Sequence, residues 1–234
     1  MPEKMLIPSI EMRLGALLES SRRKEAEALK KETSKGKPTI TLSREFGCEA
    51  FPVAERLHAL LEKKTGETWH VMDKALLEEV ARNHNLSEEM LEGLGEKSGF
   101  LDQIFSTFSP GWKTDKDHFT LLARQIISLA DKGNVIIVGR GSSILTQSMK
   151  DCFHFRLFGS AEFKAGSIAR RMKIGADEAM KVVAKKQDVR DRFIRDFLNK
   201  DARNPLYYHL LFNNDKNSPE RRAHTIMEFV FDQV

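Results

Sequence analysis

The segment Gly139-Arg140-Gly141 directly follows a strongly apolar run at residues 134–138. An arginine between two glycines at the end of a buried strand is well placed to hold a phosphate group through two parallel hydrogen bonds. Ser142 and Ser143 could cap the helix that follows. The alternative interpretation is a tight turn in which Arg140 pairs with a nearby carboxylate.

Further arginines come from two predicted helices, within LFGSAEFKAGSIARRM and KKQDVRDRFIRDF, which are joined by a break at residues 174–177. These arginines are Arg170, Arg171, Arg190, Arg192 and Arg195. Two such helices could form a lid that closes over phosphates and excludes water, as phosphoryl transfer requires. Aspartates are interspersed among the arginines, so solvated helices with surface ion pairs are the alternative.

The stretch TITLSREFGCEAFPVAERL, residues 39–57, predicts a strand, a polar loop and a helix, which is the layout of a phosphate-binding loop. A Walker loop, G-x-x-x-x-G-K-[ST], uses two glycines, a lysine and a hydroxyl residue to hold phosphates and Mg²⁺. Between this strand and this helix, those four positions hold Arg44, Glu49, Ala50 and Phe51. All four diagnostic residues are therefore absent.

Part of an anion site remains in this loop. Gly47 can adopt a positive φ, and the helix expected to begin at Pro52 offers unpaired N–H groups and a favourable dipole. Ser43 and Arg44 add a hydroxyl and a fork of donors, so an oxyanion site without lysine is physically feasible. Glu49 would compete with the anion unless it points to solvent. A β-loop-α corner without a ligand is the alternative.

The elements that must position these residues alternate along the chain from Thr39 onward. The expected strands are residues 39–42, 69–72, 134–138, 153–158 and 209–212. Helices are expected to begin at Pro52 and at Ser218, and to follow caps at Asp73 and Ser160. Another helix is expected over residues 119–132, ended by Gly133. This alternation favours right-handed crossovers and a largely parallel sheet with helices on both faces. Ligands bind such sheets beyond the carboxyl ends of the strands.

Residues 1–37 are expected to form a helical extension with a linker. The side chains of Ile7, Ile10, Leu14, Leu17 and Leu18 form one apolar stripe, which could dock on the domain, pair with a second copy or bind another protein. The main domain is expected over residues 38–234, with an inserted flap at about 86–117 and the lid at about 160–200.

Composition narrows the class of protein. The net charge of +4 comes from residues 21–37, where a solvated helix and linker are expected rather than a nucleic-acid surface. No apolar run approaches the roughly 20 residues of a membrane span, and no secretory signal is recognised, so a cytoplasmic protein is expected. Cys48 and Cys152 are expected to be free thiols without a redox role, and no Cys or His pair has metal-ligand spacing.

The segments TITLSREFG, WHVMDKALLEEVA, NVIIVGRG, HFRLFGSAEFKAGSIARR, QDVRDRF and NPLYYHLLFNND occur in an order and spacing that resembles the cytidylate-kinase-like family. This family is related to bacterial cytidylate kinase among the P-loop nucleoside monophosphate kinases. The resemblance runs over about residues 38–215. It implies a P-loop NTPase-type three-layer α/β/α fold, a five-stranded parallel sheet of order 2-3-1-4-5, a nucleoside monophosphate site, an ATP site and an arginine lid.

The resemblance also implies roles for individual residues. The phosphate loop would contain Ser43, Arg44, Gly47, Cys48, Glu49 and Ala50. Asp73 would face and orient the acceptor nucleotide, Arg140 would hold its phosphate, and Arg170, Arg171 and Arg190 would lie in the lid. The missing Walker lysine counts against ATP and Mg²⁺ as cofactors. Gly141 replaces an expected acidic residue, which counts against recognition of a cytidine sugar.

Two functional hypotheses follow. In the first, the chain binds nucleotides and transfers phosphate from ATP to a nucleoside monophosphate, with the arginines neutralising charge in the transition state. In the second, it is a catalytically inactive nucleotide or phosphate sensor that acts through protein–protein contacts, for example as a homodimer through the N-terminal helix. Measurement of turnover separates the two.

Overall fold

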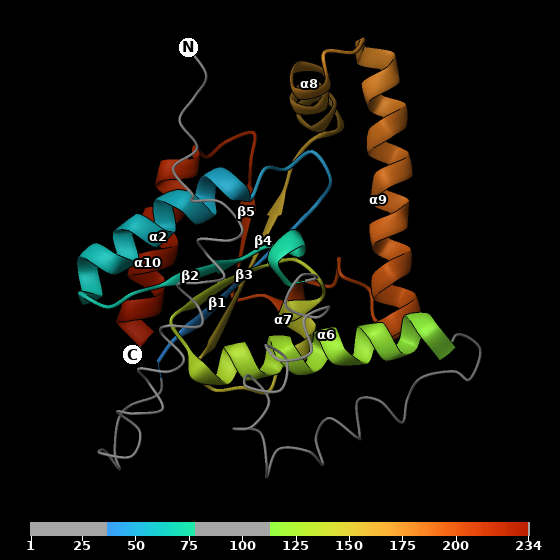
Figure 1. Ribbon diagram of the computed structural model, residues 1–234. Coiled ribbons are helices and arrows are strands. Elements are labelled where there is room, and N and C mark those ends of the chain that lie inside the picture. The colour runs from blue at the N-terminus through green and yellow to red at the C-terminus, as the bar shows by residue number, and fades with distance from the viewer. Residues whose placement is uncertain (1–36, 78–112, 234) are drawn as a thin grey trace, which may run out of the picture.

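The computed structural model describes residues 37–77 and 113–233. Within these residues, five strands form one all-parallel sheet in the order β2-β3-β1-β4-β5 (Figure 1). The strands are β1 (Thr39–Arg44), β2 (His70–Met72), β3 (Val135–Val138), β4 (Cys152–Phe158) and β5 (Leu210–Asn213). The α/β class and the parallel sheet expected from the sequence pattern are confirmed, as is the strand order that the resemblance implies, and each strand lies within two residues of its expected bounds.

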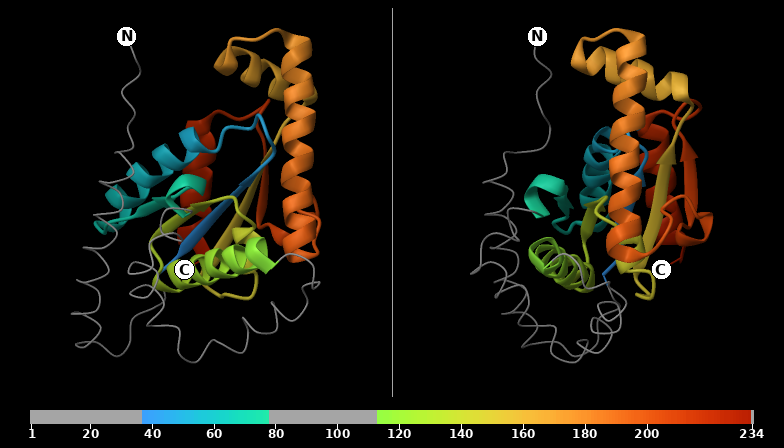
Figure 2. Two further views of the ribbon diagram at one scale, coloured as in Figure 1. Left: turned by 45° about the vertical axis from the view of Figure 1, so that its right-hand side comes forward. Right: turned by 90° about the vertical axis from the view of Figure 1, so that its right-hand side faces the viewer.

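Helices cover both faces of the sheet (Figure 2). Helices α2 (Phe51–Thr65) and α10 (Pro219–Gln233) pack together on one face, over a core that includes Ile40 and Phe155. On the other face, α6 (Lys113–Lys132) and α7 (Ser142–Leu145) bury Val135 and Ile137. Along β3, Val135 and Ile137 face one core while Ile136 and Val138 face the other, so one sheet supports two cores.

Helices α8 (Ala161–Met172) and α9 (Ala176–Leu198) form a hairpin at the carboxyl edge of the sheet (Figure 1). The last turns of α9 reach α6, where the ring centroids of Phe193 and Phe197 lie 5.5 and 4.7 Å from that of Phe119. These two helices occupy the segment expected to form the lid. Their opening and closing remains a prediction.

The face of β1 and β4 that turns toward α7 and α9 is polar although it is buried. Thr41 pairs in register with His154, and its Oγ1 lies 2.9 Å from Nδ1 of that histidine. Two residues further along, Arg156 donates a hydrogen bond of 3.3 Å to Oγ of Ser43. This polar row runs toward the carboxyl ends of the strands, where a ligand site is expected.

Several predicted helix signals are confirmed. Oδ1 of Asp73 accepts a hydrogen bond of 2.9 Å from the N–H of Leu76, and Oγ of Ser160 accepts one of 3.0 Å from the N–H of Phe163. Gly133 ends α6 with a φ of +68°. Side-chain acceptors and a left-handed glycine satisfy backbone groups that a helix end leaves without partners.

Other expectations need correction. Ser142 and Ser143 do not cap α7, because Gly141 takes the cap position with a φ of +72° and both serines are buried helical residues. Helix α2 begins at Phe51, one residue before Pro52. The described part of α6 starts at residue 113, so residues 113–117 of the expected insert belong to this helix. The rest of the insert and residues 1–36 lie outside the described residues.

None of the helices over residues 37–77 and 113–233 has the length and apolarity that crossing a bilayer requires.

Candidate functional site

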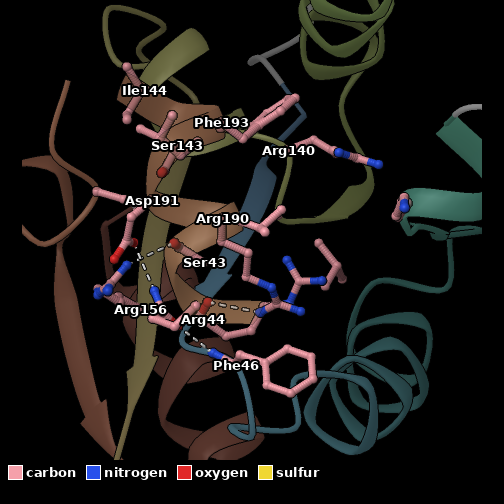
Figure 3. A pocket seen from close by; sticks show the side chains of 18 of the residues that line it. Ser43, Arg44, Phe46, Arg140, Ser143, Ile144, Arg156, Arg190, Asp191 and Phe193 are labelled. Atoms are coloured by element: carbon pink, nitrogen blue, oxygen red, sulfur yellow. Dashed lines mark hydrogen bonds between the residues drawn. The ribbon is translucent and has the colours of Figure 1, made fainter. Parts of the chain in front are cut away.

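A cavity of about 380 Å³ lies between the carboxyl ends of β1 and β3 and helix α9 (Figure 3). We call it the arginine pocket. In the described part of the chain, the charged residues that line it are Arg44, Lys74, Arg140, Arg156, Lys186, Arg190 and Asp191. Six cations face one carboxylate, and such an excess in a partly enclosed space favours an anionic ligand.

Three of these arginines stand over aromatic rings. From guanidinium carbon to ring centroid, Arg140 lies 5.2 Å from Phe193, Arg156 5.6 Å from Tyr208, and Arg190 5.0 Å from Phe46. A ring face attracts a guanidinium and fixes its plane without neutralising its charge. The pocket therefore holds these three cations in place against aromatic rings.

Arg44 is the central cation of this group. Burial, followed by the charges of Arg190 and Arg140, lowers the pKa of Arg44 to about 9, against the opposing effect of Asp73. The pKa of Arg190 is also lowered, by burial and then by Arg171 and Arg140. Mutual repulsion of this kind is relieved when an anion binds between the guanidinium groups.

The turn after β3 shapes the pocket. Gly139, Arg140 and Gly141 all have positive φ values, of +79°, +59° and +72°. A Cβ added at Gly141 would lie 2.5 Å from Cδ1 of Leu198, because α9 packs directly on the turn. The positive φ favours glycine at position 141, and any larger residue there would also require Leu198 to shift.

The loop after β1 docks on the α8–α9 hairpin. Oε2 of Glu45 lies 2.8 Å from Nζ of Lys164, and the N–H of Phe46 donates a hydrogen bond of 2.7 Å to Oε1 of Gln187. The Phe46 ring packs against the apolar residues between α8 and α9. Glu49, although exposed, accepts a hydrogen bond of 2.9 Å from Oγ of Ser167.

The loop does not fit a triphosphate with Mg²⁺. Its amides at Phe46 and Cys48 already donate to Gln187 and to the carbonyl of Glu45, the latter at 3.1 Å. Ala50 is buried at the position of the Walker lysine, and two carboxylates stand where donors would be needed. No group of three His, Cys, Asp or Glu side chains in the described residues is arranged to hold a metal ion.

Cys48 has no features of a reactive thiol. The side chain is buried, and burial followed by the charge of Glu45 raises the pKa of the thiol to about 11. A thiol must ionise before it can act as a nucleophile or redox centre.

The residues predicted for the site separate into two places. Ser43, Arg44, Arg140 and Arg190 line the arginine pocket. Glu49 and Arg170 line a second cavity of about 390 Å³, beside the start of α2 and the segment before α10. The other predicted residues line neither cavity. Arg171 is exposed on α8, and Gly47, Cys48 and Ala50 are buried within the loop. Asp73 lies close enough to Arg44 to affect the pKa of that arginine.

Arg156, Tyr208 and Gln187 also line the arginine pocket and were not predicted. The sequence could have indicated Arg156, since a cation inside the mostly apolar strand HFRLF must have a specific environment. Tyr208 and Gln187 come from a loop and from the middle of a charged helix, where single-residue patterns carry little information.

Residues 39–216 match the Cytidylate kinase-like family. No curated protein matches the chain.

Solved structures align with this chain, and the first of them shares its fold. A crystal structure of an uncharacterized protein from Eubacterium ventriosum has a TM-score of 0.65 and 18% identity, covering 84% of this chain and 99% of the other. Shikimate kinase from Bacteroides thetaiotaomicron aligns with a TM-score of 0.42 and 14% identity, over 83% of this chain and 98% of its own. Dephospho-CoA kinase from Campylobacter jejuni aligns with a TM-score of 0.34 and 11% identity, over 83% and 97%.

Proposed function

This chain belongs to the cytidylate kinase-like family, and we propose that it binds a nucleoside monophosphate in the arginine pocket and acts as a nucleotide sensor. The observation that carries the proposal is the gathering of the Arg44, Arg140 and Arg190 guanidinium groups at one cavity. Guanidinium forks match phosphate oxygens in geometry and charge, so three of them suit a phosphate dianion.

The remaining wall suits the nucleoside. The pocket volume of about 380 Å³ falls within the range of small-molecule sites, and Phe46 and Phe193 supply aromatic surface. Gln187, Asp191 and Ser143 add polar groups that could fix the orientation of a sugar or base.

Sensing rather than catalysis is supported by the loop after β1. Its amides at Phe46 and Cys48 already have partners, its two carboxylates repel a donor phosphate, and the Walker lysine is absent. Bound nucleotide would instead bridge the sheet to α9, because Arg190 lies on that helix while Arg44 ends β1 and Arg140 follows β3. A signal to a partner protein would then pass through the α8–α9 hairpin.

Phosphoryl transfer is a second candidate, favoured by the cavity that Arg170 and Arg222 line beside the start of α2. A phosphate donor could bind there without the loop amides. In that case the arginine pocket would hold the acceptor while the second cavity held the phosphate donor, and the product would be a nucleoside diphosphate.

Calorimetric titration with CMP, UMP, AMP and GMP, followed by chromatography after incubation with ATP and Mg²⁺, tests both candidates. We expect binding without a diphosphate product. Arg140→Ala should weaken binding by about ten- to a hundredfold, the effect of losing a charge-assisted hydrogen bond.

Arg192→Ala is the matched control, because Arg192 lies on the same helix as Arg190 but is exposed and pairs with Asp188 at 2.7 Å. Binding that survives Arg140→Ala, or the absence of any binding, would refute the proposal. A diphosphate that requires ATP would establish the second candidate.

A further inference from the structure

Arg156 is a second cationic centre in the arginine pocket. Its side chain is only 4% exposed and lines the cavity from strand β4. In Figure 3 its guanidinium lies on one side of Ser43, while those of Arg44 and Arg190 lie on the other. Arg156 therefore faces a different part of the pocket from the phosphate site proposed above.

The charge of Arg156 is only partly compensated within the described residues. Its hydrogen bonds go to neutral hydroxyls and are long, at 3.3 Å to Ser43 and 3.4 Å to Tyr208. Oε1 of Glu45 lies 3.7 Å away, and the same carboxylate is closer to Lys164, at 2.8 Å. Burying a cation without a close counter-charge costs free energy, which a bound anion would recover.

The strand order separates the two cationic centres. The Arg44 side chain reaches the turn after β3, where it contacts Gly139, whereas Arg156 projects from β4 toward Tyr208, which precedes β5. Arg44 thus extends toward β3 and Arg156 toward β5, on opposite sides of the β1–β4 pair (Figure 3), so each can contact a phosphate group of its own.

The pocket offers an acceptor as well as cations. Oδ1 of Asp191 accepts a hydrogen bond of 2.8 Å from Nε2 of Gln187, and the aspartate lines the cavity on the α9 side. A carboxylate there repels a third anion but accepts hydrogen bonds from hydroxyl groups. This arrangement suits a sugar or other polyol.

We infer that the ligand carries two separated phosphate groups joined by a hydroxyl-bearing unit, one held by Arg44, Arg140 and Arg190 and the other by Arg156. A nucleoside 3′,5′-bisphosphate has this chemistry. The inference rests on the proposed function, because it names the ligand class of the same pocket.

The test compares adenosine and cytidine 3′,5′-bisphosphates with the corresponding 5′- and 3′-monophosphates by calorimetry. We expect a bisphosphate to bind about ten- to a hundredfold more tightly than either of its monophosphates. Arg156→Met should remove that advantage, so that in this variant a bisphosphate binds no more tightly than its 5′-monophosphate. Arg192→Ala should preserve the advantage.

A second variant keeps the test valid if Arg156→Met fails to fold. Glu45→Gln removes the carboxylate that competes for Arg156 while retaining a hydrogen-bonding group near Lys164, so the preference for the bisphosphate should rise several-fold. Equal affinities for a bisphosphate and its 5′-monophosphate, or no change in Glu45→Gln, would overturn the inference and leave the proposed function standing. If no nucleotide binds, both fall.

Discussion

The guanidinium of Arg44 lies in the space that a side chain at Gly139 would need. A Cβ added to that glycine would overlap Nη1 of the arginine. The N–H of Gly139 also donates a hydrogen bond of 3.0 Å to the carbonyl of Leu42, so the turn after β3 is tied to β1. One glycine thus supplies both the backbone conformation of the turn and the room for a cation at the edge of the sheet.

Gly139→Ala should therefore damage both stability and binding. The φ of +79° costs an alanine about 1–2 kcal/mol, and the displaced Arg44 should weaken nucleotide binding by about tenfold. Thermal denaturation and calorimetry measure the two effects. Gly175→Ala is the control, since Gly175 has a φ of −67° and an added Cβ would have no neighbour within 4 Å. Wild-type affinity in Gly139→Ala would show that Arg44 does not contact the ligand.

Two glycines test the docking of the loop on α8. A Cβ at Gly47 would lie 2.8 Å from Cβ of Lys164, and the φ there is +92°, so Gly47→Ala should lower the free energy of unfolding by about 1–3 kcal/mol. At Gly166, inside α8, the added Cβ would meet only ordinary contacts, and alanine should stabilise the protein by up to about 1 kcal/mol. Denaturant unfolding of both variants gives the comparison, and equal effects would contradict the docked loop.

Restoring the Walker lysine should not restore ATP binding. Ala50 is buried in the same apolar cluster as Val53 and Leu57, so Ala50→Lys should cost on the order of 3 kcal/mol of stability. Glu49→Lys places an ammonium on the exposed side of the loop and should fold normally. Titration of the folded variants with ATP and Mg²⁺ measures the outcome. A marked gain in ATP affinity by Ala50→Lys would mean that the loop can rearrange into a Walker geometry.

His154 should make stability depend on pH. Burial, and then the neighbouring His209, lowers the pKa of His154 from 6.5 to about 4. Between these values the unfolded chain binds a proton that the folded protein does not, so stability falls as pH decreases from 6.5 to about 4, by about 3 kcal/mol in total. Denaturant unfolding across this range should show a smaller loss in His154→Gln. The exposed His224→Gln is the control, and parallel curves for all three proteins would exclude this contribution.

Much of the architecture could be predicted from local patterns. Apolar runs such as residues 135–138 specify buried strands, and Asp73, Gly133 and Ser160 mark helix ends through backbone hydrogen bonds made within a few residues. Because all the strands are parallel, residues after different strands necessarily meet at one edge of the sheet. This rule brings Arg44 and Arg140 to one pocket.

The helix-borne residues were harder to assign, because a sequence gives the spacing along a helix but not which face docks. Arg190 points into the pocket, whereas Arg192 pairs with Asp188 in solvent, as the solvated alternative predicts. The groups of the loop after β1 are paired with residues far away in the sequence, as Glu45 is with Lys164. These pairs form only when the α8–α9 hairpin packs against the loop. No local pattern contains that information.

Both cysteines of this chain are buried, and burial raises the pKa values of Cys48 and Cys152 to about 11 and about 12. Neither sulfur competes well for an alkylating dye at neutral pH. A cysteine introduced at the exposed Lys185 on α9 would therefore take up a fluorophore selectively in the otherwise native background. The protein is in this respect ready for single-site spectroscopic labelling.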